Sequence, residues 1–391
     1  MSPIFKERSS MKKLGIYVHI PFCIKKCNYC DFYSYTQRES IGKYVDALVV
    51  HIRSEAPLYK DYEIDTIFFG GGTPSLLEPS DFEKVASALK SSFKFTSDLE
   101  FTLEANPGTL TEEKLISYKK NGVNRLSIGL QTTFDDKLKA LGRIHTYKEF
   151  LESYNIAREC GLDNISVDIM YSLPNQTVSE LTQTLEAVCK LLPDHISSYC
   201  LKIEEKTPFG KIKDKLPLPS EDTEYEMYIS MCELLENHGY MQYEISNFAK
   251  DGYQSRHNLK YWQSEEYLGF GPSAHSFING KRYYYSPNLS QYISEIEKTQ
   301  AVEKIYEENE AEIGGISEID EYVMLKLRLS SGISEDEFYA RFGENLLDKY
   351  PKITSFTDSG YMKREGSTYS FTPKGFFVSN YILTEILNFD N

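Results

Sequence analysis

The feature that most constrains this chain is a regular alternation of strand-type and helix-type segments between residues 15 and 205. Between the strand-type runs, apolar residues recur at helical spacing, as in Ile41, Tyr44, Val45 and Leu48. Strands that alternate with helices form parallel sheets. The pattern therefore predicts an α/β fold, a partial six-unit (β/α) TIM-like barrel. The predicted strands lie at 15–20, 64–69, 99–104, 125–130, 165–170 and 195–201.

Polar and glycine residues stand where these predicted strands end. A cysteine-containing loop follows the first strand, and Gly-Gly-Gly-Thr-Pro follows the second at 70–74. Glu104 closes the third strand, Gln131 follows the fourth, and Asp168 lies near the end of the fifth. In parallel α/β barrels ligands bind at the carboxyl ends of the strands. We therefore expect these residues to form a single site on one rim.

The loop after the first strand carries Cys23, Cys27 and Cys30 at C-x3-C-x2-C spacing. Thiolate ligands select iron–sulfur clusters, zinc or copper(I). A structural zinc site needs a fourth ligand, and the nearest histidines, His19 and His51, form no second knuckle. A [4Fe–4S] cluster held by three thiolates leaves one iron open to another ligand. The spacing favours the cluster and keeps zinc as the alternative.

The remaining cysteines are scattered through apolar or helical segments. In a reducing compartment such residues are interpreted as small buried apolar side chains rather than as disulfide partners. They are Cys160, Cys189, Cys200 and Cys232.

Composition excludes several classes of function. The 391 residues carry a formal net charge of −15, which argues against binding to nucleic acid or to an anionic membrane. No apolar run approaches the ~20 residues that span a bilayer. The N-terminus lacks the apolar core of a signal peptide. We expect a cytoplasmic protein with no membrane span.

The chain is long enough for several domains, and its segments predict four parts. An N-terminal extension (1–14) precedes the barrel (15–207), a connecting region (208–320) and a C-terminal winged-helix-like module (321–391). The connector at 208–219 is expected to leave the barrel, and a helix is expected at 221–238. The C-terminal module carries eight Lys or Arg against ten Asp or Glu. We interpret it as a smaller α+β module for structure or interaction rather than for DNA binding.

Several motifs in this order resemble the radical SAM superfamily. Within it they are most similar to the oxygen-independent coproporphyrinogen III oxidase branch, and closest to its HemW-type heme chaperones. The resemblance runs from about residue 15 to the C-terminal module. The motifs are YVHIPFC at 17–23, GGGTP at 70–74, LEANPG at 103–108, SIGLQ at 127–131, LGR at 141–143, SVDIMYSLP at 166–174, HNLKYW at 257–262 and YLGFGPSAH at 267–275.

The resemblance implies a [4Fe–4S] cluster on the three cysteines and S-adenosylmethionine (SAM) on its open iron. Glycine near SAM allows close backbone approach, and arginine suits the SAM carboxylate. The resemblance also implies an electron donor such as flavodoxin or ferredoxin. The residues implied to contact SAM are Tyr17, Tyr29, Gly71, Gly72, Thr73, Glu104, Gln131, Arg143 and Asp168.

Two departures from the oxidases bear on function. The oxidases carry a fourth cysteine where this chain has Phe32, and a longer N-terminal arm. Both favour a heme chaperone that delivers heme to recipient proteins. A coproporphyrinogen III oxidase is the alternative, and an enzyme of anaerobic heme degradation or a zinc-stabilised binding module are further ones. A homodimer is possible in each case.

The HNxxYW segment is implied by the resemblance to bind heme. His257 is a candidate for the iron ligand, and Tyr261 and Trp262 could stack on the porphyrin plane. A buried histidine packed by two aromatic residues is the competing structural interpretation.

Overall fold

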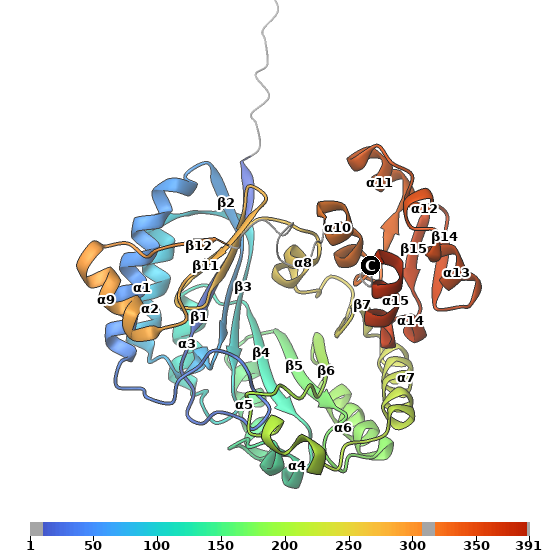
Figure 1. Ribbon diagram of the computed structural model, residues 1–391. Helices are drawn as coiled ribbons and strands as arrows, with labels where there is room; N and C mark the ends of the chain where they lie inside the picture. The colour runs from blue at the N-terminus through green and yellow to red at the C-terminus, as the bar shows by residue number, and fades with distance from the viewer. Residues whose placement is uncertain (1–10, 307–316, 389–391) are drawn as a thin grey trace, which may run out of the picture.

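The computed structural model describes residues 11–306 and 317–388 (Figure 1). Six strands pair in parallel and in sequence order, which confirms the predicted partial barrel. Of the expected N-terminal extension, residues 1–10 lie outside the described residues, and the first strand already begins at Lys12. The six strands are β1 (Lys12–Ile20), β2 (Tyr62–Gly71), β3 (Lys94–Ala105), β4 (Arg125–Gln131), β5 (Asn164–Tyr171) and β6 (His195–Cys200).

Helices cover the outer face of this curved sheet (Figure 1). The helix before β6 begins at a capping box. Thr177 accepts a hydrogen bond from the Glu180 backbone amide, and the Glu180 side chain accepts one from Thr177. The barrel helices are α1 (Ile41–Glu55), α2 (Pro79–Ser92), α3 (Glu112–Lys120), α4 (Asp135–Ala140), α5 (Tyr147–Glu159), α6 (Val178–Lys190) and α7 (Glu221–Asn237), and the short 3₁₀ turns are η1 (Ala56–Tyr59) and η2 (Pro74–Leu76).

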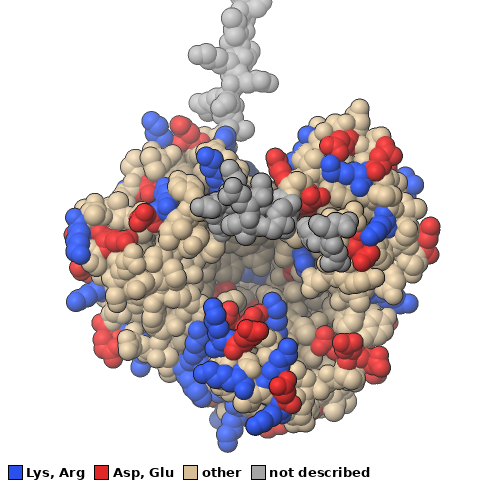
Figure 2. Space-filling model, viewed as in Figure 1, with Lys and Arg blue, Asp and Glu red and all other residues tan. Residues whose placement is uncertain are grey.

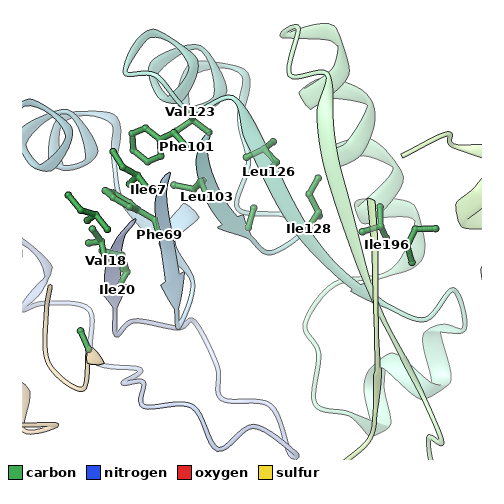
Figure 3. Packing of buried hydrophobic residues seen from close by; sticks show 14 of the residues in the cluster. Val18, Ile20, Ile67, Phe69, Phe101, Leu103, Val123, Leu126, Ile128 and Ile196 are labelled. Carbon is green, nitrogen blue, oxygen red and sulfur yellow. The ribbon is translucent and has the colours of Figure 1, made fainter. Parts of the chain in front are cut away.

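Each barrel strand divides its side chains between two environments. Alternate residues are apolar and buried against the helices, as Figure 3 shows for β1 to β4 and β6. Because successive strand residues point to opposite faces, their neighbours face the inside of the barrel. In β3, Leu103 packs in the core while Glu104 lines a cavity. In β4, Ile128 likewise packs in the core while Ser127 lines the cavity. The alternation that buries apolar side chains against the helices therefore also directs the polar side chains into the barrel.

The sheet continues beyond the six-unit barrel at both edges. β9 pairs in parallel with β1, and β8 pairs antiparallel with β6. Within the described residues they belong to one twelve-stranded sheet, which crosses the expected domain boundary at residue 207. The added elements are β7 (Met241–Glu244), β8 (Asn247–Ala249), α8 (Arg256–Trp262), β9 (Tyr267–Phe270), β10 (His275–Ile278), β11 (Lys281–Tyr284), α9 (Leu289–Thr299) and β12 (Ile305–Tyr306).

The connector at 208–219 does not leave the barrel as expected. Phe209 is buried in a small apolar cluster, and its backbone amide donates to the Asn28 carbonyl oxygen at 2.9 Å. The 3₁₀ turn η3 (Gly210–Lys215) follows directly. The connector therefore packs beside the cysteine loop. The cluster around Phe209 comprises Leu141, Met170, Leu173 and Leu201.

The C-terminal module packs helices on a three-stranded antiparallel sheet, in which residues 362–365 and 368–371 form a hairpin. Figure 1 shows the module beside α7 and α8, and Figure 2 shows that the face between it and the barrel is hollowed. Along the described part of the chain, no helix combines the length and apolarity needed to cross a membrane. The elements are α10 (Glu318–Lys326), β13 (Ile333–Ser334), α11 (Glu335–Phe342), α12 (Leu346–Lys349), α13 (Lys352–Asp358), β14 (Met362–Glu365), β15 (Thr368–Phe371), α14 (Pro373–Phe377) and α15 (Ser379–Leu387).

Replacing the N-cap of α6 tests the local contribution of its capping box. Thr177→Ala removes an acceptor for a helix-end amide, so we expect the free energy of unfolding to fall by about 1 kcal/mol. Urea denaturation measures the change. Ser87→Ala, on the exposed face of α2, is the matched control and should stay within about 0.5 kcal/mol of the wild type. An unchanged Thr177→Ala variant would contradict this account of the helix end.

Candidate functional site

A cavity of about 550 Å³ lies at the carboxyl ends of the barrel strands. It brings together the three loop cysteines and eight of the nine residues implied to contact SAM. Only Tyr17 is elsewhere, in an adjoining cavity. The predicted residues that line the larger cavity are Cys23, Cys27, Cys30, Tyr29, Gly71, Gly72, Thr73, Glu104, Gln131, Arg143 and Asp168.

The cysteine loop has little regular structure of its own and is held by its neighbours. The Gly72 amide donates to Ile20 O at 2.9 Å, and the Asn28 amide donates to Leu141 O at 2.9 Å. The Thr73 hydroxyl lies 3.6 Å from Cys23 Sγ, and Arg143 Nη1 lies 3.8 Å from Cys27 Sγ. These donors suit sulfur atoms that carry negative charge, so the loop fits three thiolate ligands.

The arrangement of the cysteines bears on which metal they can hold. No three His, Cys, Asp or Glu side chains in the described ranges are grouped to hold one metal ion. A zinc ion needs its ligands at about 2.0–2.3 Å around a single centre. A [4Fe–4S] cluster instead takes each cysteine on a different iron. Three thiols on one loop fit the cluster, in which each cysteine would bind its own iron.

Gly71, at the end of β2, and Gly72, which follows it, are needed for the packing of the protein itself. A Cβ on Gly72 would lie 2.7–2.8 Å from backbone atoms of Ile20 and Phe22. Gly71 has φ +106°, and its Cβ would meet the His19 ring. The sequence-based reason was close approach of SAM to this segment. The structure adds that glycine lets β2 lie against the strand that carries the cysteine loop.

Arg143 joins several parts of the rim. Its Nη2 donates to Asn106 Oδ1 at 2.6 Å and to Gly129 O at 2.8 Å. The Asn106 amide donates in turn to the Thr73 hydroxyl at 2.8 Å. Asn106 also lines the cavity and was not singled out from the sequence. Its position two residues beyond Glu104, within the LEANPG motif, is the signal that could have identified it.

Gln131 and two further residues complete the rim. Gln131 has φ +74°, a left-handed conformation that costs energy in a non-glycine residue and is common at functional sites. Tyr199 and Cys200 line the same cavity and were also missed. Cys200 was expected to be an apolar core residue, as Cys189 and Cys232 are, but it is only partly buried, as is Cys160. Its place at the end of β6 is the reason.

Glu104 and Asp168 are acidic groups inside the cavity wall. Burial, reinforced by the Asp168 carboxylate, raises the pKa of Glu104 to about 8. Burial also raises the pKa of Asp168, against hydrogen bonds from serines such as Ser127, whose Oγ lies 2.9 Å away. Glu104 accepts a hydrogen bond from the Gly71 amide at 3.1 Å. Both carboxyl groups are suited to a cationic or hydroxyl-bearing ligand.

A second cavity of about 340 Å³ adjoins the first, and Phe32, Gly71 and Glu104 line both. Its wall is largely aromatic. The Tyr17 hydroxyl and His19 Nδ1 are 2.9 Å apart within it. Phe32, at the position of the oxidases' fourth cysteine, is 67% exposed and stands between the two cavities. The other residues that line the second cavity are Tyr33, Tyr261, Tyr267, Ser273 and His275.

The residues of the HNxxYW segment lie on α8 and face different surroundings. His257 is fully buried, and both of its ring nitrogens have partners: Thr66 Oγ1 at 2.8 Å and the Tyr261 hydroxyl at 2.9 Å. Burial lowers the pKa of His257 to about 3, so the ring is neutral. Trp262 hydrogen-bonds to the buried Glu244. Binding of iron by His257 would therefore require one of the two ring hydrogen bonds to break, and the assignment of His257 as a ligand stays a prediction.

A positively charged surface surrounds the cysteine loop. In Figure 2, Lys and Arg gather below the central hollow, and Figure 1 places η3 in that part of the molecule. Residues 25–31 and 202–215 carry seven Lys against four Asp or Glu, in a chain of net charge −15. The lysines are all exposed, and they are Lys25, Lys26, Lys202, Lys206, Lys211, Lys213 and Lys215.

The fold and the three-cysteine cavity together define a radical SAM domain, and comparisons with known proteins agree. Residues 17–188 match the radical SAM superfamily, and residues 316–378 match the HemN C-terminal domain. The structure resembles that of coproporphyrinogen III oxidase (HemN) from Escherichia coli with a TM-score of 0.81. At 22% identity, over 96% of this chain and 90% of that one, this likeness concerns the fold alone.

Relatives named "Heme chaperone HemW" match over nearly the full length. The protein from Bacillus subtilis is 38% identical over 377 residues, which cover 95% of this chain and 98% of the relative. The one from Escherichia coli is 33% identical over 374 residues, or 95% and 97% of the two chains. The chain belongs to the HemW family of the radical SAM superfamily.

The raised pKa of Glu104 predicts a pH dependence of stability. The unfolded chain loses this proton near pH 4.5, whereas the folded chain keeps it to about pH 8. Between these values the folded state binds more protons, so the free energy of unfolding falls as pH rises. Glu104→Gln should remove this slope, and its stability relative to wild type should increase from about pH 5 to about pH 8.

Urea denaturation of the cluster-free protein at several pH values measures the effect. Glu83→Gln, on the exposed surface of α2, should leave the wild-type slope in place. If Glu104→Gln also kept the wild-type slope, the carboxyl group would not be protonated in the folded state.

Proposed function

We propose that this protein is a heme chaperone that holds a [4Fe–4S] cluster, binds SAM, and carries heme to recipient proteins. The observation that carries the proposal is full-length similarity to relatives named as heme chaperones. Phe32 supports it, because no cysteine occupies the position that the oxidases fill. The exposed ring of Phe32 instead stands where the two cavities meet.

The residues of the larger cavity fit the two cofactors. Cys23, Cys27 and Cys30 would hold the cluster, and Arg143 would offset the negative charge of the thiolates. Glu104 and Asp168 would take the cationic and hydroxyl-bearing parts of SAM. When bound, a reduced cluster and SAM supply radical chemistry. The chain's own part is to position SAM beside the cluster and to separate both from bulk water.

The alternative function is that of a coproporphyrinogen III oxidase. The motif resemblance to that branch leaves this function open, whereas the likeness to the HemN structure concerns the fold alone. The cavity contains the polar groups that SAM needs in either case, so the cofactor site does not separate the two functions. The two functions differ in the fate of the bound tetrapyrrole. A chaperone releases it unchanged, whereas an oxidase removes carboxyl groups from it.

Parallel assays of anaerobically reconstituted protein separate these functions. Titration with heme should give a saturable shift of the heme absorption band near one heme per chain. Incubation with coproporphyrinogen III, SAM and dithionite should yield no decarboxylated product. Cys27→Ser serves as the cluster control and should lose the iron–sulfur absorbance, because two thiolates hold a cluster poorly. Absence of heme binding together with product formation would overturn the proposal in favour of the oxidase.

The lysine-rich surface supports an acidic electron donor, such as a flavodoxin or ferredoxin, that docks near the cluster. η3 carries Lys211, Lys213 and Lys215, and Phe209 fixes this turn to the cysteine loop through Asn28. Opposite charges speed the encounter of protein partners and lose this effect at high salt. The surface thus lies next to the group that must be reduced.

Reversing these charges should slow reduction by such a donor. We expect the triple variant Lys211→Glu, Lys213→Glu, Lys215→Glu to reduce the rate with flavodoxin about tenfold at low salt. Dithionite, which needs no docking surface, should reduce the variant and the wild type equally fast. The control variant reverses three exposed lysines on the opposite, helical side: Lys43, Lys60 and Lys90. Equal slowing in both triple variants would mean that net charge, and not this surface, governs the encounter.

A further inference from the structure

Asn106 directly follows β3 and lies beside the cysteine loop. Its backbone is held without help from its side chain. The amide donates to Ser75 Oγ at 3.3 Å, and the carbonyl oxygen accepts from the Thr109 amide at 3.2 Å and from the Thr109 hydroxyl at 2.6 Å. The turn after β3 therefore does not depend on the Asn106 carboxamide. That group is available to the larger cavity, which Asn106 lines.

The orientation of the Asn106 carboxamide is set by its two partners. Arg143 Nη2 lies 2.6 Å away on one side, and because a guanidinium can only donate, it must face the carboxamide oxygen. The NH2 group then faces the Thr73 hydroxyl oxygen at 2.8 Å. Since the Thr73 oxygen accepts this bond, the single hydroxyl proton is left for another acceptor. Cys23 Sγ, 3.6 Å from that hydroxyl, is the acceptor it meets.

The same carboxamide orients Arg143. Nη2 is shared between Asn106 Oδ1 and Gly129 O, and Nη1 is directed at Cys27 Sγ, 3.8 Å away. Gly129 leaves room for this pair, because a Cβ there would lie 3.2 Å from Arg143 Nη2 and 3.3 Å from Asn106 Oδ1. One carboxamide thus fixes a donor toward each of two cysteines.

The hydrogen bonds of this network all run toward sulfur. Arg143 donates to Asn106, which donates to Thr73. Thr73 donates in turn to Cys23. Hydrogen bonds in series polarise and strengthen one another. Reduction adds negative charge to an iron–sulfur cluster, so hydrogen bonds to its sulfurs stabilise the reduced state more than the oxidised state.

From this network we propose that Asn106 is a positioning residue that raises the reduction potential of the cluster. It holds two donors, the Thr73 hydroxyl and the Arg143 guanidinium, against their cysteine sulfurs. The inference rests on the cluster of the proposed function. It is independent of the cargo, because the five residues of the network line the larger cavity and not the smaller aromatic one.

Potentiometric titration of the anaerobically reconstituted full-length protein, followed by EPR of the reduced cluster and carried out without SAM, tests the inference. Asn106→Ala removes both contacts of the carboxamide, so we expect a more negative midpoint potential. Asn106→Asp keeps the shape but presents an acceptor to Thr73, which turns the hydroxyl proton away from Cys23, and it adds negative charge. We expect this variant to lower the equilibrium constant for reduction at least about tenfold, which is about 59 mV for a one-electron couple.

The magnetic coupling of the cluster to an exchangeable proton gives a second readout. In the wild type, the Thr73 hydroxyl proton should give a hyperfine coupling that disappears in deuterated buffer. Asn106→Asp and Thr73→Val should both lose this coupling. In the Thr73→Val background, Asn106→Ala should shift the potential less than it does in the wild type, because part of its effect acts through Thr73.

Asn124 provides a matched control. Its carboxamide also makes two hydrogen bonds, one with the Phe101 amide at 2.8 Å and one with Leu99 O at 2.7 Å. It stands before the amino end of β4, at the end of the strand opposite the cavity. Asn124→Asp should leave the potential unchanged, and iron and sulfide contents show that each variant holds a complete cluster. Unchanged potentials in both Asn106 variants, or an equal shift in Asn124→Asp, would overturn the inference.

Failure of the inference is distinguishable from failure of the proposed function. If the wild-type protein holds no cluster, the cluster assignment and this inference both fall. If the potential and the proton coupling are the same in the wild type and in the Asn106 variants, the proposed function stands and only the role of Asn106 is wrong. Titration of the same samples with heme reports on the cargo separately.

Discussion

The site depends on backbone hydrogen bonds that hold a loop with almost no structure of its own. Gly72 binds the end of β1, Leu141 accepts from Asn28, and Phe209 donates back to Asn28. These partners come from parts of the chain that are far apart in sequence. A loop fixed in this way can present three thiols without a helix or strand to carry them, because its neighbours satisfy its amides and carbonyls. Gly71 and Gly72, where β2 ends, make this contact possible.

The barrel could be predicted because its strands have two kinds of neighbours. Alternate residues such as Ile128 and Leu103 must face the helices, and this requirement is visible as an apolar pattern. The polar residues that alternate with these apolar ones, such as Glu104 and Ser127, must then face the inside of the barrel, where they line one cavity. The same logic placed Glu104, Gln131 and Asp168 on one rim. The set of expected SAM-contact residues came from the resemblance; eight of its nine members line one cavity, and their contacts with SAM stay a prediction.

What the sequence did not reveal are contacts between remote segments. In the sequence, Phe209 is one aromatic residue in a polar connector, and its burial depends on four other residues from remote parts of the chain. The pairing of β9 with β1 joins residues about 250 positions apart, and neither strand carries a local signal for its partner. His257 was a candidate ligand because the HNxxYW segment resembles the motif of the family. Its two hydrogen bonds became visible only when Thr66 and Tyr261 were placed around it.

The continuous sheet has a mechanical consequence. The pairing of β1 with β9 joins the strand before the cysteine loop to the one that bears Tyr267, and α8 precedes that strand. Separating these parts would break a ladder of backbone hydrogen bonds in the protein interior. If the protein carries heme as proposed, the ligand would therefore enter through side-chain and loop movement at the rim, where Phe32 is exposed, and not by separation of two rigid halves.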